Sequence, residues 1–154
     1  MKIADILSPE CVISDLRGAT KKEILEELAL PVSRIHRINL DEIVSILMAR
    51  EQLGSTGMGD GVAIPHGKVP GLKDIVGALG KSAKGLDFDS IDKKPCHIFF
   101  MLLAPSTFVT QHLKALARVA TLLKDPSLRH RIMESSSASE IHHLLIDHDS
   151  TIED

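Results

Sequence analysis

The chain has 154 residues, 44% of which are apolar, and a formal net charge of −3. A chain of this length and apolar content forms one domain with a substantial core, which excludes an intrinsically disordered protein. The nearly balanced charge and the absence of Tyr and Trp exclude a basic, base-stacking surface for nucleic acid. We therefore expect a single domain over residues 1–154, with a core over about 4–148 and a tail over 149–154.

No segment predicts secretion or a membrane span. The N-terminal MKIADILSPE carries acidic residues and has no apolar stretch of signal-peptide length, and the longest apolar run, IFFMLLA (98–104), is too short to cross a bilayer. Two cysteines, Cys11 and Cys96, are too few for a disulfide framework, so we expect two partly buried thiols. These features favour a soluble, cytoplasmic protein that does not insert into a membrane.

Helix signals and short strand signals alternate along the chain, which favours an α/β layer architecture. Thr20 and Glu23 have the spacing of a capping box, so a helix is expected over 20–28. The segment LDEIVSILMARE (40–51) repeats apolar residues at helical spacing and predicts a second helix, which ends at Gly54.

The second half of the chain predicts strands first and helices afterwards. The segment CHIFFMLLA (96–104) is apolar without interruption, as in a central strand covered on both faces. Two other expected strands are VAI (62–64) and DIVGALGKS (74–82). Helices are expected over about 110–124, from Asp125-Pro126 onward, and over 139–148 with a Ser137–Glu140 capping box; SSSAS (135–139) is expected to be a loop and DHDSTIED (147–154) to fray.

The segment GSTGMGDGVAIPHGK (54–68) joins a glycine tract to a short strand that stops at a proline and a histidine. Pro65 interrupts the strand, so His66 is expected at its carboxyl end, where open α/β sheets bind ligands. The tract lacks the ending of a nucleotide P-loop and the spacing of a dinucleotide fold, but it offers backbone N–H groups and two hydroxyls to a phosphate. A glycine turn before a surface histidine is the alternative. The phosphate-binding residues expected here are Gly54, Ser55, Thr56, Gly57, Gly67 and Lys68.

Two further residues favour an anion site. His112 lies on the inward-facing stripe of its helix with Leu116 and, if Thr110 is the N-cap, in the first turn, where the helix dipole favours anions and disfavours imidazolium. Arg50 ends its own helix and offers a planar fork of donors to phosphate oxygens. The alternatives are a histidine at the edge of the core, bonded to a backbone carbonyl, and an arginine that only answers the helix dipole.

The stretch AREQLGSTGMGDGVAIPHGK (49–68) closely resembles the phosphorylation-site segment of the type-2 IIA proteins of the bacterial phosphotransferase system. It is most similar to the nitrogen-regulatory branch, beside the mannitol- and fructose-specific IIA domains. The resemblance extends from IADILSPECV to the last helix. It implies a single domain with a mixed β-sheet flanked by helices on both faces.

The resemblance also implies a role for each site residue. His66 would accept a phosphoryl group on Nε2 from a small histidine phosphocarrier protein of the HPr or NPr type. His112, in LAPSTFVTQHL, would be the second active-site histidine, and Arg50 the arginine before the glycine tract. Family members more often carry Asn where this chain has Asp60. A carboxylate at this position would repel a phosphoryl group unless it points away, so Asp60 is assigned no role in binding phosphate.

Transfer between two imidazoles needs in-line positioning and neutralisation of oxygen charge, and it needs no metal and no small-molecule cofactor. His66 must be neutral, with its other ring nitrogen donating to a backbone carbonyl. Arg50, Lys68, His112 and the amides of the tract are the available donors. Their combination predicts a phosphohistidine protein.

A metal-binding protein is an alternative reading of the eight histidines, since His66 and His112 together could hold an adventitious zinc ion. The remaining histidines show no ligand spacing: His142 and His143 are adjacent, and His36, His97, His130 and His148 are scattered.

The output of a phosphohistidine protein has two candidates. In the first, the phosphorylation state regulates a bound target protein; in the second, phosphate passes to a separate IIB chain of a fructose- or mannitol-type transporter. Docking of the phosphocarrier needs an apolar surface, for which the candidates are Met58, Val69, Leu72 and Phe108, each of which is also a candidate core residue.

Overall fold

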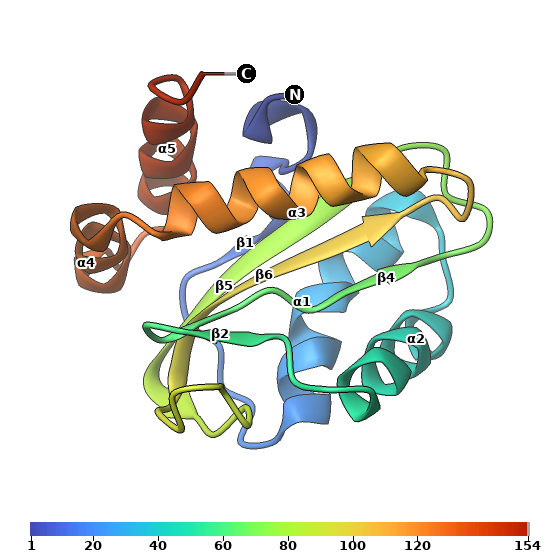
Figure 1. The fold of residues 1–154 in the computed structure, drawn as a ribbon, viewed down its shortest axis with the longest axis horizontal. Coiled ribbons are helices and arrows are strands. Elements are labelled where there is room, and N and C mark those ends of the chain that lie inside the picture. Colours follow the sequence, from blue (N-terminus) through green and yellow to red (C-terminus); the bar gives the residue numbers. More distant parts are fainter. Residues whose placement is uncertain (154) are drawn as a thin grey trace.

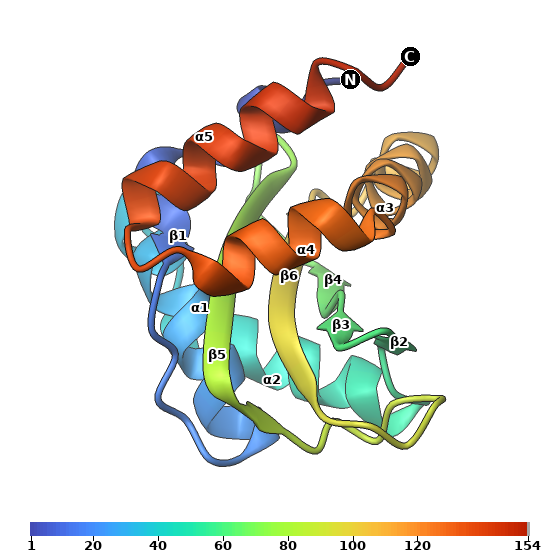
Figure 2. The ribbon, with the colours of Figure 1, turned by 90° about the vertical axis from the view of Figure 1, so that its left-hand side faces the viewer.

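A computed structural model describes residues 1–153, within which six strands form one mixed sheet covered by helices on both faces (Figures 1 and 2). Helices α1 and α2 lie on one face and α3, α4 and α5 on the other, so both faces are covered, as the family resemblance implied. The helices are α1 (Lys21–His36), α2 (Leu40–Gln52), α3 (Val109–Leu123), α4 (Pro126–Glu134) and α5 (Ala138–Asp149). The strands are β1 (Val12–Ile13), β2 (Gly57–Gly59), β3 (Val62–Ala63), β4 (His66–Lys68), β5 (Val76–Leu86) and β6 (Cys96–Ala104).

The centre of the sheet is the antiparallel pair β5 and β6, and β1 lies parallel to β5. On the other side β3 and β4 both lie parallel to β6, and β2 pairs antiparallel with β3 at the edge. The apolar segment 96–104 is therefore a central strand, as predicted, and every one of its residues except His97 is buried.

Strands β3 and β4 follow one continuous track along β6. Ala63 is opposite Phe99 and His66 is opposite Leu102, so the register is the same on both sides of the break. Pro65 has no N–H, but its carbonyl still accepts a hydrogen bond of 2.9 Å from Leu102 N. The expectation that His66 stands at the end of a strand is therefore wrong: the proline removes one donor, and the strand resumes at the histidine.

The first helix begins as predicted but runs further. Thr20 Oγ1 accepts a hydrogen bond of 3.2 Å from the Glu23 amide. The helix then continues to His36 through Pro31, although a proline removes one helical hydrogen bond. Val32, fully buried beyond the proline, extends the apolar face, so packing against the core outweighs the local cost.

The C-terminal helices correct three expectations. Thr110 is not the N-cap of α3. The N-cap is Phe108, whose carbonyl accepts the first helical hydrogen bond, from His112 N, and whose side chain makes no capping bond. The loop before α5 is shorter than SSSAS, since α5 begins at Ala138, with Ser137 Oγ accepting from Glu140 N as predicted. The third expectation is that residues 147–154 fray, but α5 continues to Asp149. Asp154 lies outside the described residues.

The fraying is wrong for 147–149 because Asp149 joins the two ends of the chain. Its carboxylate is buried, accepts from Ile3 N at 2.8 Å and pairs with Arg118 Nε at 2.7 Å. The thiols of Cys11 and Cys96 are also more buried than expected, at 2% and 0% exposure, and burial raises the pKa of Cys96 to about 11. Within residues 1–153, no helix combines the length and the hydropathy that a bilayer crossing requires.

Candidate functional site

The imidazole of His66 is oriented by its own backbone neighbourhood. Nδ1 lies 2.8 Å from the carbonyl oxygen of Ile64. Because a carbonyl only accepts, Nδ1 carries the proton, and the lone pair of the neutral ring is on Nε2. The ring is half-buried, and this burial lowers the pKa of His66 from 6.5. The Arg50 charge reinforces this effect, and the Ile64 hydrogen bond and the Glu51 charge oppose it. Burial therefore favours the neutral ring, which the expected chemistry requires.

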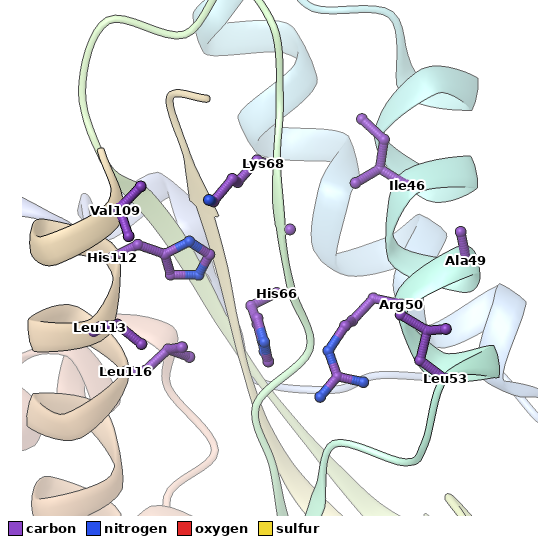
Figure 3. A pocket seen from close by; sticks show the side chains of 11 residues that line it. Ile46, Ala49, Arg50, Leu53, His66, Lys68, Val109, His112, Leu113 and Leu116 are labelled. Atoms are coloured by element: carbon purple, nitrogen blue, oxygen red, sulfur yellow. The ribbon is translucent and has the colours of Figure 1, made fainter. Parts of the chain in front are cut away.

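His112 lies directly beside His66 although the two are 46 positions apart in the sequence. The ring centroids are 5.5 Å apart and the planes meet at 86°, an edge-to-face contact (Figure 3). His112 is only 7% exposed, and within residues 1–153 its buried Nε2 has no hydrogen-bond partner. Burial, with the nearby His66 and Lys68, lowers the pKa of His112. An unpartnered nitrogen of this kind needs a ligand or water, which a satisfied core histidine does not.

Arg50 lies on the opposite side of His66 from His112 (Figure 3). Its Nη1 donates to the carbonyl oxygen of Gly54 at 2.8 Å, which fixes the guanidinium just beyond the end of α2. This bond uses one of the five donors of the guanidinium. Arg50 therefore interacts with the C-terminal end of its own helix, as the alternative reading expects. It also lines both cavities beside His66, where it could bind phosphate oxygens.

Two cavities adjoin His66. The larger has a volume of about 640 Å³ and lies between α2, β4 and α3; the smaller, of about 380 Å³, lies beside the glycine tract. His66, Arg50 and Leu116 line both. The other residues of the larger cavity are Ile46, Ala49, Leu53, Gly67, Lys68, Val109, His112 and Leu113, so the site is an apolar hollow with a few polar groups near its centre.

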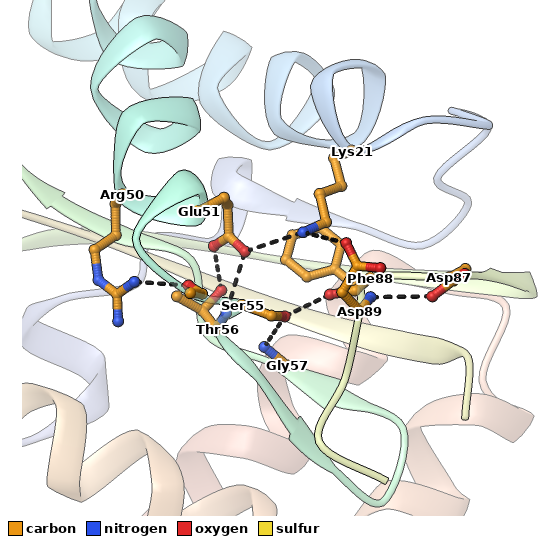
Figure 4. Close-up of polar contacts among 10 residues, drawn as sticks. Lys21, Arg50, Glu51, Ser55, Thr56, Gly57, Asp87, Phe88 and Asp89 are labelled. Carbon is orange, nitrogen blue, oxygen red and sulfur yellow. Dashed lines mark hydrogen bonds and ion pairs between the residues drawn. The ribbon is translucent and has the colours of Figure 1, made fainter. Parts of the chain in front are cut away.

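The hydroxyls of the glycine tract have partners inside the protein (Figure 4). Ser55 Oγ donates to the carbonyl of Phe88, and Thr56 Oγ1 donates to Glu51. The Gly57 amide in turn donates to Ser55 Oγ at 2.9 Å. These contacts fix the tract in place, and its expected role in holding phosphate stays a prediction. They also bring in Glu51, which the sequence analysis did not single out.

Gly67 and Lys68 continue from His66 along β4. A Cβ on Gly67 would lie 2.6 Å from Ile46 Cγ2, so the absence of a side chain at Gly67 lets α2 pack closely against β4. Lys68 is exposed and lines the larger cavity with His112. Asp60 lines neither cavity beside His66.

The exposed apolar residues around the site differ from most of those expected. Val69 is fully buried, so it is core; Leu72 and Phe108 are half-buried and pack against the core. Met58 is exposed and lines the smaller cavity. The exposed residues that the sequence analysis missed are Leu53, Val109 and Leu113, all on the larger cavity. The spacing of Val109 and Leu113, four apart on one helix, was the available signal.

The histidines near the candidate site are also possible metal ligands. Over positions 1–153, no three His, Cys, Asp or Glu side chains come together in a way that could hold a metal ion. His66 and His112 form a pair without a third protein ligand of these types.

The solved structures that this fold resembles define its class. The nitrogen regulatory protein IIA-Ntr from Neisseria meningitidis superposes with a TM-score of 0.86 at 36% identity, covering 93% of this chain and 98% of that one. The Escherichia coli mannitol enzyme IIA, solved in complex with phosphorylated enzyme IIB, has the same fold, with a TM-score of 0.75 at 18% identity and coverage of 91% and 98%. The class is that of the IIA domains of the phosphotransferase system.

The sequence comparisons then specify the family. The model of the family described as "Phosphoenolpyruvate-dependent sugar phosphotransferase system, EIIA 2" matches residues 5–148, and the chain belongs to this family. The nitrogen regulatory protein of Bradyrhizobium diazoefficiens is 39% identical over 145 residues, which are 94% of this chain and 95% of that protein. The nitrogen regulatory protein of Pseudomonas aeruginosa is 32% identical over 148 residues, 96% of each chain.

Proposed function

We propose that this chain accepts a phosphoryl group on Nε2 of His66 from a histidine phosphocarrier protein of the HPr or NPr type, and that its phosphorylation state regulates a partner protein. The observation that supports this most directly is the hydrogen bond from Nδ1 to the Ile64 carbonyl, which leaves the Nε2 lone pair available beside two cavities. Membership of the phosphotransferase family supplies the reaction class.

In the proposed step, the lone pair of His66 Nε2 attacks phosphorus as the phosphorus–nitrogen bond of the phosphocarrier breaks. The departing imidazole keeps the electron pair of that bond, so no other reactant is needed. The His66 ring becomes positively charged as the new bond forms. The carbonyl of Ile64, which accepts from Nδ1, stabilises this charge.

The arriving phosphoryl group carries close to two negative charges. Arg50 and Lys68 supply positive charge, and an N–H on the buried Nε2 of His112 would find its acceptor in a phosphoryl oxygen. Each charge-assisted hydrogen bond contributes about 1.5–3 kcal/mol. Two or three such bonds are enough to hold the group in line.

Regulation by contact is supported by the relatives, which are named nitrogen regulatory proteins, and by the surroundings of His66. Leu53, Val109 and Leu113 are more than half exposed around the larger cavity. Adding charge in the middle of an exposed apolar surface changes which partner it binds. The second candidate output is transfer to a separate IIB chain, which the solved complex of the mannitol proteins favours.

Phosphoryl labelling tests the proposal. Labelled phosphoenolpyruvate, the first phosphotransferase enzyme and the phosphocarrier should give an acid-labile, base-stable label on this chain. We expect no label on His66→Ala and full label on His130→Ala, a matched control that removes an exposed histidine. Label on the His66 variant would refute the proposal. Transfer onward to a purified IIB chain would favour the relay, and phosphorylation-dependent binding without transfer would favour regulation.

His112→Ala tests the supporting histidine. The variant should fold and take up label roughly tenfold to a hundredfold more slowly, because one charge-assisted bond to the transition state is lost. Rapid-quench kinetics at saturating phosphocarrier measure the effect. A rate equal to that of the wild type would show that His112 does not act in transfer.

A further inference from the structure

A buried carboxylate lies beneath the glycine tract. The side chain of Glu51 is only 3% exposed, and Figure 4 shows it between α1 and the tract. Its Oε1 accepts from the Thr56 amide at 3.1 Å and its Oε2 accepts from the Thr56 hydroxyl. Both donors of one residue therefore converge on one carboxylate.

This carboxylate is itself held from α1. Lys21 Nζ lies 3.6 Å from Glu51 Oε1 and 3.0 Å from the carboxylate of Asp89, and it is 4.8 Å from the ring centroid of Phe88. A buried carboxylate is costly unless it is paired and fully hydrogen-bonded. Glu51 meets this condition with two donors and an ammonium group, which fixes its position.

The hydrogen bonds continue from Glu51 to the imidazole of His66. Thr56, fixed by Glu51 through its amide, accepts from Ile64 N through its carbonyl at 3.1 Å. Ile64 then accepts the proton of His66 Nδ1 through its own carbonyl at 2.8 Å. Every donor in this series points toward the carboxylate. The residue before Glu51, Arg50, holds the start of the same tract through the carbonyl of Gly54.

We propose that Glu51 is a positioning residue for His66, acting through the hydrogen-bonded backbone of Thr56 and Ile64. It sets where the Ile64 carbonyl lies, and this carbonyl keeps the proton on Nδ1 and the lone pair on Nε2. Its effect on transfer rests on the proposed function. The arrangement assigns Thr56 to anchoring, since both of its donors are used by Glu51.

Two variants separate hydrogen bonding from charge. Glu51→Gln can accept from the Thr56 amide and donate to the Thr56 hydroxyl, so it should keep the maximal transfer rate within about twofold. Glu51→Met fills the space without an acceptor, and its rate at saturating phosphocarrier should fall by roughly tenfold or more, since small displacements of a reacting group slow a reaction strongly. The phosphocarrier concentration at half-saturation should not change. Asp41→Ala, an exposed carboxylate on the same helix, is the matched control and should match the wild type.

Nitrogen NMR of the His66 ring gives a readout that needs no phosphoryl transfer. The wild type and Glu51→Gln should show neutral His66 with the proton on Nδ1, and folded Glu51→Met should show a mixture of tautomers. A single Nδ1–H tautomer and a wild-type rate in Glu51→Met would overturn the inference, as would a tenfold loss in folded Glu51→Gln. If Glu51→Met does not fold, the Gln variant decides. If the wild type takes up no phosphoryl group, the proposed function fails, and the tautomer still decides the role of Glu51.

Discussion

Replacing Gly67 by alanine perturbs the packing of β4 against α2 next to His66. The added Cβ would lie 2.6 Å from Ile46 Cγ2, far inside the roughly 3.5 Å of carbon–carbon contact. Ile46 cannot simply rotate away, because a β-branched side chain in a helix has one strongly preferred rotamer. The strand or the helix must therefore move.

The expected cost follows from two opposing effects. Overpacking of this kind destabilises by about 1–3 kcal/mol. Alanine also restricts the unfolded chain, which stabilises by about 0.4–1 kcal/mol where the backbone conformation is compatible. Overpacking wins, and for a domain of about 150 residues we expect a melting temperature lower by roughly 2–8 °C. Since Arg50 is on the displaced helix, phosphoryl uptake by His66 should slow by about tenfold.

Thermal unfolding and rapid-quench kinetics measure both effects. Ile46→Ala removes the atom that the new Cβ meets, so the double variant should lose less stability than the sum of the two single variants. Unchanged stability and rate in Gly67→Ala, or strictly additive losses in the double variant, would show that this contact does not set the position of β4.

Two further predictions concern stability. Burial lowers the pKa of His66 and His112 from 6.5, the value that applies in the unfolded chain. Between the folded and unfolded pKa values the unfolded chain therefore binds more protons than the folded protein, so the free energy of unfolding should fall as the pH drops below about 6.5. Above that pH both states hold neutral histidines, and stability should not depend on these two groups. Urea unfolding at several pH values measures this, and an equally steep fall in a variant with both histidines replaced by glutamine would contradict it. Asp149→Ala should lose about 3–5 kcal/mol, because it breaks the buried ion pair with Arg118 and removes the acceptor of the Ile3 amide. Denaturant unfolding checks this, and a loss below 1 kcal/mol would mean that the C-terminal end of α5 contributes little.

The sequence predicted where helices begin better than where they end. Thr20, Asp125 and Ser137 each accept a hydrogen bond from the third residue beyond them, because N-capping is a local interaction that four residues contain. The end of α1 was missed, since burial of Val32 in the core carries the helix through Pro31. The end of α5 was also missed because of a long-range contact: Asp149 accepts a hydrogen bond from Ile3 N, near the other end of the chain.

The candidate site divides in the same way. The residues 49–68 carry a recognisable pattern, so His66 and Arg50 were found as candidates, and the family resemblance added the role of His112. The pattern did not reveal what the hydroxyls of Ser55 and Thr56 contact, because Phe88 and Glu51 are brought to them by folding. It also did not separate Val69, which is core, from the exposed Leu113 beside His112.

By itself, the sequence determined the alternation of helices and strands, the family, and the residues able to carry the chemistry, because periodicity, capping and short motifs are properties of neighbouring residues. The tertiary structure alone decided that the ring centroids of His112 and His66 lie 5.5 Å apart and that a new strand begins at His66. It also placed a buried glutamate behind the glycine tract. These features depend on contacts between segments far apart in the chain, whose geometry is set by packing against a shared core.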